Sequence, residues 1–126
     1  MRAMRFERFG GPEVLEEADV PDPVAGPGET LVEVAAAGVN FGDIKQIAGE
    51  LTEGPYAPKG PLPHIPGMEV VGRTADGRRV LGYVRQGGYA AKTVVAERDL
   101  GRVVKVLAVG SGASGAVALD QRGRAP

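Results

Sequence analysis

The sequence contains no cysteine, no tryptophan and a single histidine, His64, among its 126 residues. The lack of cysteine excludes disulfides, thiolate nucleophiles and every zinc site that is built on cysteine. One histidine cannot supply the three or four protein ligands that a zinc site needs, so we expect no metal. His64 stands between Pro63 and Ile65 in a turn, where an exposed side chain without a role is expected.

Long apolar runs are lacking as well. No run approaches the roughly 20 apolar residues that span a bilayer. Charges occur throughout the N-terminal segment MRAMRFERFGG, where a signal peptide would have an apolar core. We therefore expect a cytoplasmic protein that does not enter a membrane.

Neither sign of charge dominates. The chain has 15 basic and 16 acidic residues and a net charge of −1, so nucleic acid is not an expected partner. The signs are unevenly spread, with 11 acids and 4 bases in residues 1–53 and 5 acids and 11 bases in residues 54–126. A basic second half suits an anionic ligand such as a phosphorylated cofactor. Only Arg78 and Arg79 are adjacent, so we favour a scattered set of solvated charges as the explanation of the asymmetry.

Glycine and proline are abundant, with 20 and 10 residues, and they separate short apolar runs. This pattern predicts a strand-rich fold. We expect strands over residues 3–6, 14–20, 30–37, 68–74, 79–84, 89–96 and 103–109. A hairpin turn is predicted at Asp76-Gly77, and a long loop over residues 52–67. The predicted fold class is mainly β, a compact barrel or sandwich with one short helix.

The helix is predicted directly after Asn40, because Phe41, Ile44 and Ile47 recur at a spacing of three residues. Asn40 is a favoured N-cap residue. Asp43 falls in the first turn, where the helix dipole favours an acid. Considered alone, both polar residues have structural roles.

Three segments, GVNFGD at 38–43, IPGMEVVG at 65–72 and GGYAAKTVV at 87–95, resemble the N-terminal domain of medium-chain dehydrogenase/reductases. The most similar branch is the zinc-independent quinone oxidoreductases, the zeta-crystallin-like group. The resemblance implies a GroES-like, partly open β-barrel over residues 1–106 that packs against a separate Rossmann domain. It also implies NADP as cofactor, bound as NADPH in the cleft between the domains, and hydride transfer to a quinone or an enone.

The resemblance assigns roles to single residues. In the zinc-dependent branch a cysteine stands at the position of Asn40 and a histidine at that of Met68, just before Glu69, so no catalytic zinc is implied. Asn40 becomes the catalytic residue and, together with Phe41, a cofactor contact. Phe41 and Met68 become lining residues of the substrate pocket.

Plainer roles compete with these, and one family feature is missing. Asn40 is explained equally by capping, Met68 by core packing, and Glu69 by a local partner for a half-buried acid. Relatives carry an Arg-x-Gly-x-Tyr run after the helix, whereas residues 47–51 read IAGEL. Tyr56 is the candidate that replaces the missing tyrosine in the substrate pocket.

Residues 110–115, GSGASG, match G-x-G-x-x-G after an apolar run, so Gly110, Gly112 and Gly115 are candidates for binding a cofactor phosphate. The ribose-binding acid, expected about 20 residues later, would lie beyond Pro126. Two interpretations remain: the first turn of a truncated cofactor domain, or a last barrel strand at 101–106 followed by a Gly/Ala-rich tail over 107–126, with the Rossmann domain absent. We favour the second.

Together these features predict the substrate-side domain of a zinc-independent, NADPH-dependent oxidoreductase that reduces quinones or enones by hydride transfer. Because groups for the pyrophosphate and ribose are missing, we expect the chain to be incomplete and inactive alone. The alternative is a non-catalytic GroES-like barrel. It would bind a partner or form a homodimer through the surface that a Rossmann domain would otherwise cover.

Overall fold

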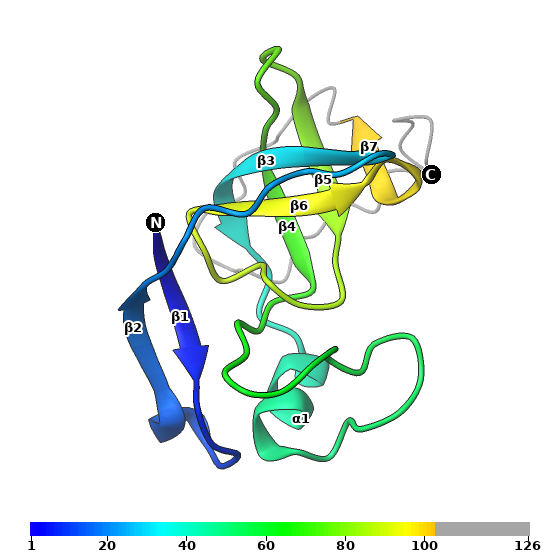
Figure 1. The fold of residues 1–126 in the computed structure, drawn as a ribbon. Coiled ribbons are helices and arrows are strands. Elements are labelled where there is room, and N and C mark those ends of the chain that lie inside the picture. The colour runs from blue at the N-terminus through cyan, green and yellow to red at the C-terminus, as the bar shows by residue number, and fades with distance from the viewer. Residues whose placement is uncertain (103–126) are drawn as a thin grey trace, which may run out of the picture.

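The computed structural model describes residues 1–102, which form a mainly β fold with one short helix (Figure 1). The strands are β1 (Arg2–Phe6), β2 (Leu15–Asp19), β3 (Glu29–Ala37), β4 (Glu69–Arg73), β5 (Arg79–Tyr83), β6 (Lys92–Ala96) and β7 (Leu100–Arg102). The helix α1 (Phe41–Ala48) lies between β3 and β4. In the part of the chain that the structure describes, no helix has the length and apolar character needed to cross a membrane.

Five strands form one antiparallel sheet in the order β6-β3-β4-β5-β7, which curls into half a barrel (Figure 1). Successive side chains of a strand point to opposite faces, so each short valine-rich strand directs alternate residues inward. The resulting core consists of Val32, Val70, Val80 and Val95. A register shift in β3 between Val34 and Ala36 alters the strand shortly before the chain passes into α1.

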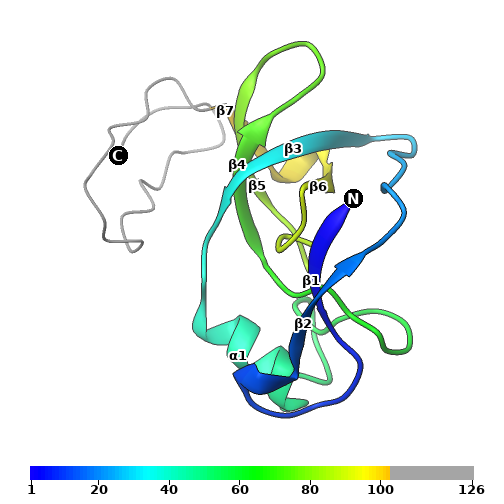
Figure 2. The ribbon, with the colours of Figure 1, turned by 90° about the vertical axis from the view of Figure 1, so that its left-hand side faces the viewer.

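The other two strands, β1 and β2, form an antiparallel ribbon that lies beside α1 (Figures 1 and 2). Between ribbon and helix lies a second small core of Phe6, Val14 and Ile47. The ribbon is joined to the half-barrel through residues 89–91, whose main chain pairs with β1 around an Ala3–Ala90 bridge. The two parts of the described fold therefore share a continuous hydrogen-bonded connection.

The structure confirms most of the elements predicted from the sequence, including the helix after Asn40 and the β4–β5 hairpin at Asp76-Gly77. The loop over residues 52–67 is confirmed too, since it contains neither helix nor strand. Residues 103–109, predicted as a strand, and residues 107–126, predicted as a tail, lie outside the described residues.

Two predicted strands differ in their bounds. The run 14–20 begins as a strand only at Leu15, because a 3-10 turn over Pro12–Val14 precedes it. The run 89–96 divides, because residues 89–91 pair with β1 whereas β6, beginning at Lys92, pairs with β3. The first difference is a local turn, in which the Val14 N–H donates to the Gly11 carbonyl at 3.1 Å. The second comes from a partner distant in sequence, which short-range patterns do not contain.

The expectation that His64 is exposed is wrong, since the side chain is 5% exposed. His64 exchanges two backbone hydrogen bonds with Phe6, at 2.9 and 3.1 Å. The imidazole packs edge-on against the Phe6 ring, with the centroids 5.8 Å apart. Burial disfavours the charged imidazolium and lowers the pKa of His64 from its ordinary value of 6.5.

We expect acid to destabilise the domain through His64. The unfolded chain binds a proton near pH 6.5, whereas the folded chain binds it only at lower pH, so the stabilisation is present above pH 6.5 and is lost as the pH falls. Urea denaturation followed by circular dichroism at about pH 7.5 and about pH 5.5 would measure this loss. The His64→Gln variant should show a smaller loss, because the chain has one histidine. Equal pH dependence in both proteins would contradict the assignment.

Candidate functional site

The three sequence segments that carry the resemblance meet at one buried carboxylate, Asp43, which is 1% exposed. Its Oδ2 accepts hydrogen bonds from the Tyr89 hydroxyl at 2.8 Å and the Asn40 backbone N–H at 2.9 Å. Its Oδ1 accepts a hydrogen bond from the Gly67 N–H at 3.2 Å. We call these four residues the Asp43 hub. The hub joins the end of β3 and the start of α1 to the approaches of β4 and β6.

Gly67 allows two stretches of main chain to approach closely within the hub. Its backbone has φ +106°, and a Cβ at this position would stand 2.7 Å from the Tyr89 nitrogen and 2.8 Å from the Gly88 carbonyl carbon. The Gly88 N–H donates to the Gly67 carbonyl at 3.1 Å, and the Tyr89 N–H donates to the Pro66 carbonyl at 2.9 Å. Glycine is therefore required here both by conformation and by space.

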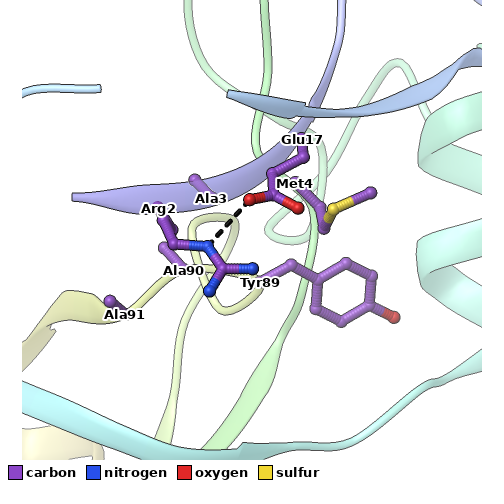
Figure 3. A pocket seen from close by; sticks show the side chains of 7 residues that line it. All are labelled: Arg2, Ala3, Met4, Glu17, Tyr89, Ala90 and Ala91. Atoms are coloured by element: carbon purple, nitrogen blue, oxygen red, sulfur yellow. Dashed lines mark hydrogen bonds and ion pairs between the residues drawn. The ribbon is translucent and has the colours of Figure 1, made fainter. Parts of the chain in front are cut away.

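Tyr89 has a polar end in the hub and an apolar ring outside it. Burial, together with the hydrogen bond to the Asp43 carboxylate, raises the pKa of Tyr89 well above its ordinary value, so the phenol remains a donor. Beside the ring lies a shallow hollow of about 310 Å³ between β1 and residues 89–91, crossed by the Arg2–Glu17 ion pair of 2.8 Å (Figure 3). None of the residues predicted for the site lines this hollow.

Asn40 is held in place at the N-terminus of α1. Its backbone N–H donates to Asp43, and its carbonyl accepts from the Asp43 N–H at 3.1 Å. The predicted capping position is thus confirmed, and the half-buried side chain remains beside Gly38. A Cβ on Gly38 would stand 3.7 Å from Asn40 Nδ2 and 3.1 Å from Glu69 Oε2. The side chains of Asn40 and Glu69 therefore lie close around Gly38, where even a methyl group would crowd the carboxylate. We call the surface formed by Gly38, Asn40 and Glu69 the Gly38 seat.

Met68 and Phe41 lie on either side of the first turn of α1. The thioether of Met68 covers Gly42, where a Cβ would stand 3.0 Å from Cε and 3.2 Å from Sδ. Phe41 is 73% exposed, with Lys45 Nζ 5.3 Å from its ring centroid. The structure thus brings Asn40, Phe41 and Met68 to the start of one helix. Within residues 1–102, no group of three or more His, Cys, Asp or Glu side chains is placed to hold a metal ion.

Tyr56 is placed differently from these three residues. It lies in the loop after α1, is 61% exposed, and its backbone carbonyl accepts from Gln46 Nε2 at 2.7 Å. Gln46 also donates to the Arg85 carbonyl at 2.8 Å, so it ties the loop to the segment after β5. No described hydrogen bond or ring contact in residues 1–102 joins the Tyr56 side chain to Asn40. Gly110, Gly112 and Gly115 lie outside the described residues.

Sequence reasoning missed Tyr89 and Tyr83 as residues of this region. Tyr89 enters the hub through a bond to a residue 46 positions earlier. Tyr83, at the end of β5, pairs in register with Glu69. The alternating pattern of β4 and β5, with buried Val70 and Val80 inside, already indicated that Glu69 and Tyr83 share the outer face.

An apolar surface adjoins the site. Three large apolar residues close together in sequence at the start of α1 are exposed. Val39 and Phe41 are each 73% exposed, and Ile44 is 49% exposed. Single exposed apolar side chains are common, but a group of them indicates a contact surface. We call these three residues the α1 apolar surface.

Comparisons with known proteins agree with this architecture. Residues 26–79 match the alcohol dehydrogenase GroES-like domain. The quinone oxidoreductase of Lama guanicoe is 34% identical over 112 residues, which are 79% of this chain and 32% of that protein. The quinone oxidoreductase of Mus musculus is 41% identical over 73 residues, which are 57% of this chain and 20% of that protein.

Solved structures are similar as well. The quinone oxidoreductase from Thermus thermophilus, also solved in complex with NADPH, has a TM-score of 0.71 and 39% identity over 85% of this chain and 34% of that one. That of Pseudomonas syringae pv. Tomato has a TM-score of 0.73 and 27% identity over 84% of this chain and 34% of that one. The chain therefore spans about a third or less of the length of these relatives.

Proposed function

Because this chain belongs to the medium-chain dehydrogenase/reductase family and carries its GroES-like domain, we propose that it forms the substrate side of an NADPH-dependent oxidoreductase. The substrate is a small molecule with a conjugated carbonyl, a quinone or an enone. The observation that carries the proposal is the Gly38 seat, the surface formed by Gly38, Asn40 and Glu69 at the start of α1.

The residues at the seat fit a planar carbonyl compound. The Asp43 hub fixes the backbone of Asn40. The side-chain Nδ2 of Asn40, beside Gly38, is the donor to the carbonyl oxygen as negative charge develops there. Met68 and exposed Phe41 offer soft apolar faces to a flat ring. When bound, the nicotinamide of NADPH supplies the hydride, and a proton from water completes the reduced product. Phe41 beside Asn40 is the residue that we propose contacts this cofactor.

Positioning rather than metal activation is the contribution that these side chains make. By the resemblance, Asn40 and Met68 stand where the zinc-dependent branch carries a cysteine and a histidine. The amide of Asn40 and the thioether of Met68 are poor ligands for zinc. Hydride transfer to an already electron-poor ring depends mainly on distance and orientation. We therefore propose a zinc-independent reductase. We also propose that the protein is located in the cytoplasm and that Tyr56, in the loop after α1, contacts larger substrates. Phosphate contacts of the cofactor are proposed for Gly110, Gly112 and Gly115.

One observation favours a second role for the same domain. The α1 apolar surface is exposed in the described residues, and it adjoins the site. A non-catalytic barrel would use this surface to bind a partner or a second copy of the chain. Light scattering of the purified chain over a range of concentrations distinguishes the two roles, because a dimerisation module gains mass with concentration, and a Phe41→Ser, Ile44→Ser variant should lose that gain.

A methyl group at Gly38 should weaken the binding of a quinone. We expect Gly38→Ala to weaken binding of toluquinone by about tenfold or more, because the new methyl group covers the surface beside Asn40 and, at 3.1 Å from Oε2, displaces the Glu69 side chain. Binding is measured by amide chemical shifts of the ¹⁵N-labelled chain, which has no cysteine to add to the quinone. The matched control is Gly26→Ala, whose methyl group meets a single atom, Glu29 Oε2, at 3.4 Å.

The same titration tests the proposed function itself. In the unmodified chain, toluquinone should shift the amide signals of Asn40, Phe41, Met68 and Glu69. Signals that stay constant up to the solubility of the quinone would overturn the proposal. If Gly38→Ala and the unmodified chain bound toluquinone with equal affinity, the substrate would not bind at the Gly38 seat.

A further inference from the structure

Tyr83 stands in the same cross-strand row as the Gly38 seat. The Gly38 N–H donates to the Glu69 carbonyl at 2.9 Å, which extends the β3–β4 pairing by one residue. On the other side, Glu69 pairs in register with Tyr83 of β5. Gly38, Glu69 and Tyr83 are therefore neighbours across three strands, and their side-chain positions share the outer face of the sheet.

The pairing type brings the Tyr83 and Glu69 side chains close together. The Val84 N–H donates to the Met68 carbonyl at 2.8 Å, so Met68 and Val84 form a hydrogen-bonded pair. Pairs alternate along an antiparallel ladder, so Glu69 and Tyr83 form the non-hydrogen-bonded type, in which side chains approach most closely. Glu69 bends towards Gly38, as its Oε2 shows. Tyr83 thus lies on the side of Glu69 that is opposite Gly38.

The phenol of Tyr83 is available for a ligand. The residue is 49% exposed, and among the hydrogen bonds described for residues 1–102 none uses its hydroxyl. Tyr89, by contrast, has its hydroxyl engaged in the hub. A large aromatic ring with an uncommitted donor in the same row as the Gly38 seat is suited to orienting a ligand.

We infer that Tyr83 contacts the substrate and determines its orientation: its ring lies against a quinone bound over the Gly38 seat, and its hydroxyl donates a hydrogen bond to a carbonyl oxygen. This inference rests on the proposed function. Asn40 then offers its donor Nδ2 from one side of Glu69, and Tyr83 offers its hydroxyl from the other. A substrate with two carbonyl groups uses both donors, so the pair favours quinones over simple enones.

The inference is tested by comparing toluquinone with toluene, which has the same methyl-substituted ring but no carbonyl. We expect Tyr83→Phe to weaken toluquinone binding by about 5–10-fold, the effect of one lost hydrogen bond, and to leave toluene binding unchanged. The readout is the amide shift titration of the ¹⁵N-labelled chain described above. Thr30→Val is the control, because it also removes one hydroxyl from the sheet, at the opposite end of β3 from Gly38.

The outcomes separate the two proposals. If the unmodified chain binds toluquinone at Asn40 and Tyr83→Phe binds it equally well, Tyr83 is no substrate contact and the proposed function stands. If the unmodified chain binds no toluquinone, the proposed function fails and the inference fails with it. Equal weakening for toluquinone and toluene would assign Tyr83 a packing role only, and would overturn the hydrogen bond. Equal weakening by Thr30→Val would show a general loss of stability and would also overturn it.

Discussion

Replacing Gly67 with alanine should remove a large share of the free energy of unfolding of the domain. The left-handed backbone at φ +106° adds strain, and the new Cβ would stand 2.7 Å from the Tyr89 nitrogen and 2.6 Å from its ring. Strain and overpacking each cost about 1–3 kcal/mol, so we expect a loss of about 4 kcal/mol. The free energy of unfolding of a whole domain is about 5–15 kcal/mol. Urea denaturation followed by circular dichroism measures the loss, because the chain has no tryptophan for fluorescence.

A second glycine separates strain from crowding in this experiment. Gly77 in the β4–β5 turn has φ +84°, and a Cβ there meets nothing within 4 Å. Gly77→Ala should therefore lower the free energy of unfolding by about 1–2 kcal/mol, the cost of backbone strain alone. If the two variants lost equal stability, the close approach of residues 67 and 88–89 would not be a main stabilising feature of the fold.

Replacing Asp43 with asparagine should have the second-largest effect, a loss of about 2–3 kcal/mol. The carboxylate accepts hydrogen bonds from two backbone N–H groups and from the Tyr89 hydroxyl. An asparagine amide offers one oxygen only, so whichever way it turns, a buried backbone N–H faces an NH₂ group and loses its acceptor. Urea denaturation gives the stability, and the ¹⁵N shift of Asn40 reports directly on the hub.

The matched control is Asp76→Asn in the β4–β5 turn. Asp76 also accepts hydrogen bonds, from the Thr74 hydroxyl and the Arg78 guanidinium, but its side chain is 63% exposed. Interactions at such sites contribute about 0–1 kcal/mol, so Asp76→Asn should be nearly neutral. A loss for Asp43→Asn no larger than that of its control would show that the hub does not hold the three segments together.

Local features of the chain were predictable, and distant pairings were not. The spacing of Phe41, Ile44 and Ile47 and the Asp76-Gly77 pair each act within a few residues, and both the helix and the hairpin are present. His64 was misplaced because its burial depends on Phe6, a residue 58 positions earlier. Nothing in the Pro63–Ile65 context contains that information.

The candidate site, too, has local features that the sequence predicts and distant contacts that it does not. Asn40 was assignable as a cap from its residue type and position, and the structure places it so. The partners that fix it, Gly67 and Tyr89, lie far along the chain and are joined through one carboxylate. Tyr83 shares a row with Gly38 because of strand register, which a single sequence does not specify until the order of the strands is known.

The pairing of β3 with β6 has a consequence for the way the chain acquires its structure. The partners of β3 in β6 lie roughly sixty positions away, and β1 reaches residues 89–91 across nearly the whole described chain. On the ribosome, Val32 and Val70 must therefore remain uncovered until residue 95 has been synthesised and has left the exit tunnel. Folding has to be late and all-or-none, with the slow rates of domains dominated by long-range contacts. We therefore expect the exposed valine-rich strands of the nascent chain to benefit from shielding by chaperones.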